Sequence, residues 1–304
     1  MTATRHAFLP LTAGLLAFSC GMALANDERV GASIGVGLAN IRAHETVFSG
    51  DHKLSQLEWQ SKAVQVLRGS LDIDVGSGWS VKLEGKTGIN GNGHMVDYDW
   101  LVPGADWTHR SEHDDTGLDH YYNGSVEVNR LLFGDSLQNL SVGIGGRYTD
   151  VKWTARGGDF VYSVDSFRDT IGSFTSGVAG ISYQQKIPVL YATLNGEQTM
   201  GRFRLTGALE VGAVIRNRSG DDHWLRNLRV DDSFKLSPMF GAKAGIEYSL
   251  TQNIALYLDG SFEATKFRRG DAEYADTTGN TYYEDGAGGG FAAGYIGTGV
   301  RGSF

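Results

Sequence analysis

The sequence predicts an all-β fold, a transmembrane antiparallel up-and-down β-barrel of about ten strands with long extracellular loops. Three observations lead to this expectation: a period of two in the apolar pattern, a composition rich in glycine and aromatic residues, and an export signal at the N-terminus. The 304 residues include 43 glycines but only 4 prolines, whereas average usage gives about 21 glycines in such a chain. The mean hydropathy is -0.24, and no apolar run after the export signal approaches the ~18 residues of a transmembrane helix. Composition alone also allows a soluble all-β protein, so periodicity has to decide between the two.

The first 25 residues have the layout of a secretory signal peptide. Arg5 precedes an apolar run at residues 7–18, and Ala23-Leu24-Ala25 provides the small residues of a signal peptidase site. We therefore expect residues 1–25 to be removed on export and residues 26–304 to form the barrel.

Cys20 is the only cysteine and lies before that cleavage point. A lipoprotein signal is the alternative, but it places small residues ahead of the cysteine, and Phe18 does not fit. Removal of residues 1–25 leaves a chain without a thiol, which excludes cysteine catalysis, disulfide bonds and cysteine-bound metals.

Alternation with a period of two is clearest at residues 202–216. One face carries Phe203, Leu205, Gly207, Leu209, Val211, Ala213 and Ile215, and the other carries Arg202, Arg204, Thr206 and Glu210. Successive side chains of a strand point to opposite faces, so one face suits lipid and the other suits water.

Ten segments are expected as strands by the same criterion. They are residues 30–43, 54–76, 79–89, 118–133, 138–155, 179–195, 201–217, 235–249, 253–268 and 290–304. Short links at 76–78, 196–200 and 249–252 alternate with long links at 90–117, 156–178, 218–234 and 269–289. This asymmetry predicts tight periplasmic turns and long extracellular loops. A soluble β-sandwich is the alternative fold, but its strands rarely run this long.

Acidic residues gather in two of the expected long loops, although the net charge of the whole chain is only -8. The first group is Asp97, Asp99, Asp106, Glu112, Asp114, Asp115 and Asp119, and the second is Asp221, Asp222, Asp231 and Asp232. An acidic rim would attract cationic peptides. The alternative interpretation is a hydrated surface that keeps the loops soluble.

Two pairs within these groups have a spacing that suits chemistry. Asp97 and Asp99 lie on the same side of an extended strand, and so do Asp221 and His223. Two close carboxylates tend to share a proton and can act as an acid. A carboxylate beside an imidazole stabilises its protonated form and lets it act as a base. Such spacings also arise by chance, so alone they leave the function open.

Five segments, in this order along the chain, resemble the omptin family of outer-membrane proteases. They are Ser55-Gln56-Leu57-Glu58-Trp59, Met95-Val96-Asp97-Tyr98-Asp99-Trp100, Ala155-Arg156-Gly157-Gly158, residues 167–174 and Asp221-Asp222-His223. The resemblance implies a ten-stranded barrel and an endopeptidase site in an extracellular groove. It implies catalysis by Asp97 with Asp99 facing Asp221 with His223, around a water nucleophile.

The same resemblance weighs against a serine mechanism. Ser111 and His113 have the spacing of a nucleophile and its base, but the family's serine at the matching place is not the nucleophile. No metal site is expected, because the histidines show no ligand spacing in the sequence.

Substrate selection is also implied by the resemblance. Omptins prefer basic residues next to the scissile bond, and Glu45 matches one acid of their pocket. Met95 and Ile181 match its apolar walls, which would lie along an Arg or Lys stem. Ser219 stands where the family commonly has a second acid, so weaker selection is expected.

The family also needs lipopolysaccharide and binds it through basic residues on the outer wall, so lipopolysaccharide is the expected lipid partner and is expected to support activity. Lys186 matches one of them. Asp150 stands where another is expected, although Arg147 and Lys152 are near in sequence. The other expected partners are peptides with basic residues, and no nucleic acid is expected.

The resulting expectation is an enzyme of the cell outer membrane with its active site on the extracellular side. The main alternative is a barrel of the same fold that acts as an adhesin with little proteolysis. A passive porin is the third interpretation, and bilayer conductance would reveal it.

Overall fold

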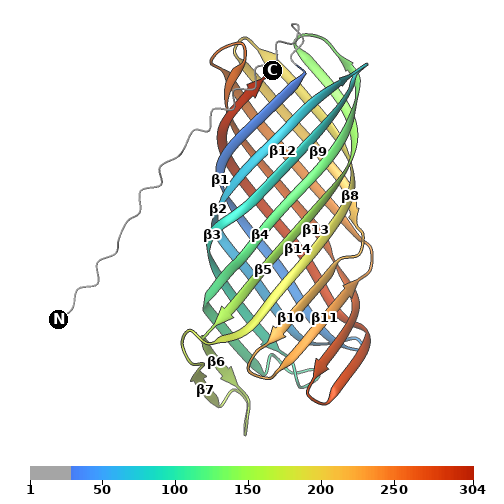
Figure 1. Ribbon diagram of the computed structural model, residues 1–304. Helices are drawn as coiled ribbons and strands as arrows, with labels where there is room; N and C mark the ends of the chain where they lie inside the picture. Colours follow the sequence, from blue (N-terminus) through green and yellow to red (C-terminus); the bar gives the residue numbers. More distant parts are fainter. Residues whose placement is uncertain (1–28) are drawn as a thin grey trace, which may run out of the picture.

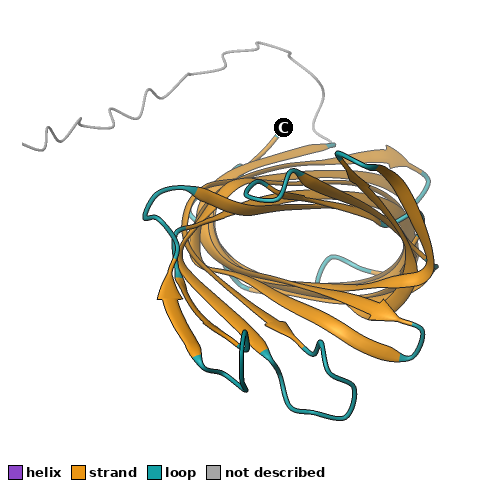
Figure 2. Ribbon diagram, turned by 90° about the horizontal axis from the view of Figure 1, so that it is seen from below, coloured by secondary structure: helices purple, strands orange, loops and turns teal. Residues whose placement is uncertain are grey.

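Strand β1 (Val30–Ser49) pairs antiparallel with β2 (His52–Gly76) on one side and with β14 (Gly279–Ser303) on the other. The first and last strands therefore close the sheet into a barrel, as Figure 1 shows for this computed structural model. The structure describes residues 29–304, so the expected signal peptide at 1–25 lies outside the described residues. A ring closed on itself, visible end-on in Figure 2, excludes a two-sheet sandwich.

Over residues 29–304, ten antiparallel barrel strands form the wall, two of them each made of two consecutive elements, which confirms the expected number. Besides β1, β2 and β14, the long barrel strands are β3 (Trp79–Asp99), β4 (His109–Gly134), β5 (Gln138–Arg156), β8 (Ala179–Met200) and β13 (Ile254–Asp276). The other two barrel strands are β9 (Phe203–Val214) continued by β10 (Arg218–His223), and β11 (Leu228–Phe234) continued by β12 (Ser237–Ser249). A small hairpin of β6 (Asp159–Tyr162) and β7 (Thr170–Ser173) pairs with the start of β4.

The expectation of long loops is wrong for most of their length, because the strands continue through them. Only residues 100–108 separate β3 from β4, and only residues 277–278 separate β13 from β14. The extensions pair with their neighbours in regular register; Asp97 lies opposite Ser111, for example. Beyond the membrane both faces of a strand meet polar surroundings, so no apolar alternation marks these parts in the sequence.

The two faces of the wall have opposite character along its middle. Apolar side chains exposed on the outside include Ile34, Val36, Leu38, Leu83, Ile144, Leu190, Leu209, Leu258 and Ile296. The lumen instead holds buried ion pairs, and Arg147 bonds Glu210 at 2.5 Å and Glu263 at 2.6 Å. This split is the pattern of a transmembrane barrel with a filled interior.

Among the described residues there is no helix long and apolar enough to cross a membrane.

The two ends of the barrel differ. The first and last described strands meet at one end, where the amide of Val30 donates to the carbonyl of Phe304. The short turns at 77–78, 135–137, 201–202 and 250–253 lie at this end (Figure 1). The other end carries the strand extensions, the β6–β7 hairpin and the β10–β11 hairpin. All four predicted catalytic residues belong to this second end.

Candidate active site

A cavity of about 600 Å³ opens among the strand extensions at the end remote from the termini. The residues that line it come from strands all around the barrel. The ionisable and hydroxyl side chains among its lining residues are Glu45, Thr46, Ser55, Asp97, Asp99, His109, Ser111, His113, Tyr162, Asp221, His223, Arg226, Asp232 and Tyr274. The structure thus brings together the four predicted catalytic residues, which are up to 126 positions apart in the chain.

The first predicted pair stands on β3. Asp97 and Asp99 alternate with outward residues, so both face the cavity. Ser55 on the neighbouring strand donates a hydrogen bond of 2.9 Å to Asp97. Burial and the nearby charge of Asp99 raise the pKa of Asp97 to about 8, and burial also raises the pKa of Asp99. The pair therefore retains a proton at neutral pH.

The second predicted pair stands on β10. Nε2 of His223 lies 2.6 Å from Oδ2 of Asp221, and the side chain of Asp221 is only 2% exposed. The turn that follows is anchored by Trp224, whose indole donates to Ser182 at 2.8 Å. The carboxylate is thus placed to orient the imidazole and to stabilise its protonated form.

Arg226, in the same turn, covers the other nitrogen of His223. Its Nη2 lies 2.6 Å from Nδ1 of His223. A guanidinium only donates, so Nδ1 is the acceptor here and Nε2 carries the hydrogen bonded to Asp221. The charge of Arg226 also acts on Asp97 and Asp99 and opposes the rise in their pKa values. Sequence reasoning missed Arg226, because nothing local predicts where a turn side chain points.

The predicted pocket residues occupy different depths. Glu45 is buried at the cavity wall and accepts a hydrogen bond of 3.2 Å from Trp59. Ile181 also lines the cavity. Met95 is fully buried beneath the lining, where it pairs across the strands with Trp59 and His113.

Ser219 is buried and faces an acid that sequence reasoning did not assign to the pocket. Its hydroxyl donates a hydrogen bond of 2.9 Å to Asp232 on β11. Asp232 lines the cavity, whereas its neighbour Asp231 points outward and pairs with Arg229. The period of two in residues 230–234 is visible in the sequence and would have placed Asp232 on the inner face.

Ser111 and His113 also meet in the cavity wall. Nε2 of His113 lies 3.0 Å from Oγ of Ser111, and the ring stacks on Phe174 at 5.5 Å between centroids. Burial lowers the pKa of His113, so the ring is neutral at pH 7. The charged group that acts on His113 is His94, a cation when protonated and not a carboxylate. A serine–histidine contact therefore exists, but over residues 29–304 no carboxylate is bonded to His113 to orient it as a base.

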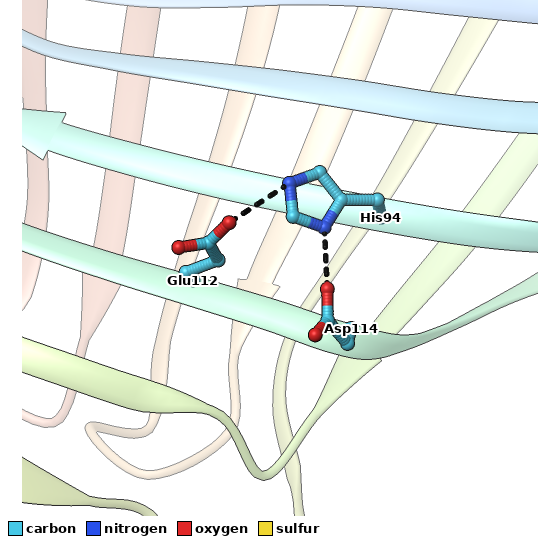
Figure 3. Close-up of side chains that lie close together, drawn as sticks. All are labelled: His94, Glu112 and Asp114. Carbon is cyan, nitrogen blue, oxygen red and sulfur yellow. Dashed lines mark hydrogen bonds and ion pairs between the residues drawn. The ribbon is translucent and has the colours of Figure 1, made fainter.

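Three potential metal ligands meet on the outer wall, at His94, Glu112 and Asp114 (Figure 3). Nδ1 of His94 lies 2.9 Å from Asp114, and Nε2 lies 3.5 Å from Glu112. The histidine spacing in the sequence did not indicate this cluster, because β3 and β4 bring it together. The two ring nitrogens face different carboxylates, which is the arrangement of an ion-paired surface histidine.

The predicted lipopolysaccharide residue Lys186 is exposed on the outer wall. It lies across the ladders from Asp150 and Arg218. The carboxylate of Asp150 already has a partner, because its Oδ1 lies 2.8 Å from Nε2 of His120. Arg147 points into the lumen, since its side chain is 5% exposed and bound to two glutamates. Arg147 therefore cannot replace the basic residue that Asp150 displaces.

Known proteins resemble this chain over nearly its whole described length. The sequence model of the Omptin family matches residues 26–304. Protease 7 of Escherichia coli (strain K12) is 28% identical over 273 residues, 86% of each chain. The plasminogen activator of Yersinia pestis is 27% identical over 238 residues, 77% of this chain and 75% of that one. The crystal structure of the outer membrane protease OmpT from Escherichia coli matches with a TM-score of 0.87 at 25% identity, covering 92% of this chain and 98% of that one.

Proposed function

Since this chain belongs to the omptin family of outer-membrane proteases, we propose that it is an endopeptidase that cleaves next to basic residues with water as the nucleophile. The observation that carries the proposal is the meeting of two pairs, Asp97 with Asp99 and Asp221 with His223, in one cavity. One pair retains a proton and the other holds an oriented imidazole. An acid and a base on opposite sides of a cleft are what peptide hydrolysis requires.

In this mechanism His223 takes a proton from the water, and the resulting hydroxide attacks the carbonyl carbon. Asp221 stabilises the imidazolium. Asp97 and Asp99 share a proton, and the carboxyl group that carries it donates a hydrogen bond to the carbonyl oxygen as this oxygen becomes negative. His223 then returns its proton to the leaving amine as the C–N bond breaks, so no covalent bond to the enzyme forms.

Arg226 has to leave Nδ1 of His223 before a water can use that nitrogen as its base, because Nε2 is held by Asp221. A basic substrate side chain would meet the carboxylate of Glu45, with its stem along Ile181. An adhesin has no requirement for an acid and a base in one cavity. An enzymatic function therefore accounts for more of the residues in the site than a binding function does.

The test is cleavage of a mixed peptide library by the purified refolded barrel, with and without lipopolysaccharide, followed by mass spectrometry. We expect cuts next to Arg or Lys, and one ¹⁸O atom from labelled water in each new carboxylate after a single turnover. Labelling of Ser111 by a serine-directed reagent with loss of activity would contradict the water mechanism. Cuts with no basic preference would contradict the proposed specificity.

We also propose that the cavity faces the extracellular side, that residues 1–25 are removed on export, and that lipopolysaccharide binds near Lys186. Whole cells should then cleave an added impermeant peptide, and the mature protein should begin at Asn26. Lys186→Ala should lower the stimulation by lipopolysaccharide. Equal stimulation of the parent and Lys186→Ala would contradict this lipid site.

A further inference from the structure

Two buried carboxylates of the cavity wall, Glu45 and Asp232, form no ion pair with a cation of residues 29–304. Glu45 is 3% exposed and Asp232 is 6% exposed. Over residues 29–304, the charges that act most strongly on either group are those of other carboxylates, Asp221 above all. Buried charges are normally paired, because an isolated one is costly to keep out of water. Such acids either keep their protons or, when ionised, need a cation beside them.

The lumen of the same barrel shows the usual arrangement. Glu210 is as buried as Glu45, yet it is paired with Arg147 at 2.5 Å and with Lys243 at 2.9 Å. Glu127, also buried in the lumen, instead accepts hydrogen bonds from Tyr191 and Asn195. Glu45 and Asp232 differ from Glu127 in that both line the cavity, so a cation from outside the protein can reach them.

Asp232 reaches this wall through the register of the β10–β11 hairpin. Ser219 and Asp232 are directly opposite each other in that ladder, and such side chains have Cβ atoms about 4.5–5.5 Å apart. The hydroxyl of Ser219 donates to Oδ2 of Asp232, which fixes the carboxylate and leaves its other oxygen for a second donor. A carboxylate absent from position 219 is thus present one strand away.

We propose that Asp232 is the second acid of the specificity pocket, binding together with Glu45 the guanidinium or ammonium group of the substrate side chain next to the scissile bond. The inference rests on the proposed function and replaces the expectation of weak selection drawn from Ser219 alone. Two acids at adjacent places can hold a planar guanidinium by several charge-assisted hydrogen bonds. Burial raises the pKa of Asp232 to about 8, and a bound cation would favour its ionised form.

The test compares kcat/KM for matched peptides that carry arginine or uncharged citrulline at the selected position. Asp232→Asn removes the charge and keeps the shape and the acceptor for Ser219, so the arginine-to-citrulline ratio should fall roughly tenfold or more. Asp231→Asn is the matched control. That acid is the next residue, has the same carboxyl group and is 55% exposed on the outer wall, so its variant should keep the parent ratio.

A second variant moves the acid back across the ladder. Adding Ser219→Asp to Asp232→Asn should restore at least half of the lost arginine-to-citrulline ratio, measured on a logarithmic scale. If Asp232 had only a structural role, this second substitution would not restore the ratio. A parent without any basic preference would overturn the proposed function. A parent with a strong preference that Asp232→Asn leaves intact would overturn this inference alone. Retained heat-modifiable migration on gels shows that each variant is folded.

Discussion

The guanidinium of Arg226 lies 2.6 Å from Nδ1 of His223, on the nitrogen that a water nucleophile would need. Arg226 comes from the turn between β10 and β11, whose first residue, Trp224, is hydrogen bonded to Ser182. A guanidinium only donates hydrogen bonds, so this contact occupies the lone pair of Nδ1. The contact therefore holds the predicted base out of use until the arginine is displaced.

Removal of this contact should raise activity. Arg226→Ala should increase kcat/KM roughly threefold or more on short peptides, because a hydrogen bond to a charged group contributes about 1.5–3 kcal/mol and this exposed one contributes less. Arg229→Ala is the control, since Arg229 lies in the same hairpin but bonds the outer acids Asp222 and Asp231. A loss of activity in Arg226→Ala would instead indicate that the guanidinium stabilises the transition state.

Loss of the predicted acid or base should be far more costly than loss of the serine. Asp97→Ala and His223→Ala should each lower kcat by at least about a hundredfold, as expected for a general acid–base group. Ser111→Ala should cost less than roughly tenfold, because no carboxylate in the described part of the chain orients its partner His113. Initial rates on one fluorogenic peptide measure all three variants. The reverse order of effects would support a serine nucleophile.

The shared proton of the Asp97–Asp99 pair predicts a pH limb. Because burial and Asp99 raise the pKa of Asp97 to about 8, the proton is present below that pH and is lost above it. With a citrulline peptide, which does not depend on the pocket charges, kcat/KM should therefore fall as pH rises through about 8. The residual activity of Asp97→Asn should lack this limb. A parent profile that keeps rising well above pH 8 would contradict the assignment of the acid.

The buried ion pairs of the lumen predict a cost in stability. Glu210→Gln breaks the buried ion pairs with Arg147 and Lys243 and leaves Arg147 with Glu263 alone; breaking such a pair costs about 3–5 kcal/mol. Urea titration of the refolded barrel in detergent measures the free energy of unfolding. Glu197→Gln is the control, because its pair with Arg204 spans 3.6 Å and is partly exposed, so it should cost less than about 1 kcal/mol. Equal losses in the two variants would contradict this account.

The sequence by itself determined the barrel and the two reactive pairs. The alternation of apolar and polar residues is local, so it identifies strands such as β9 and β12 without knowledge of the strands they pair with. Spacing by two is local as well, and it placed Asp97 with Asp99, and Asp221 with His223, on common faces before their strands were paired. The cavity confirms that these faces meet.

Only the tertiary structure decided which groups surround those pairs. The register of β10 against β11 puts Asp232 opposite Ser219, and the path of one turn puts Arg226 on His223. The inward face of β5 takes Arg147 away from the outer wall that Asp150 faces. Each of these relationships depends on pairing between segments distant in sequence or on the direction of a turn. Local periodicity carries no information about either, because it records only which face a side chain occupies on its own strand.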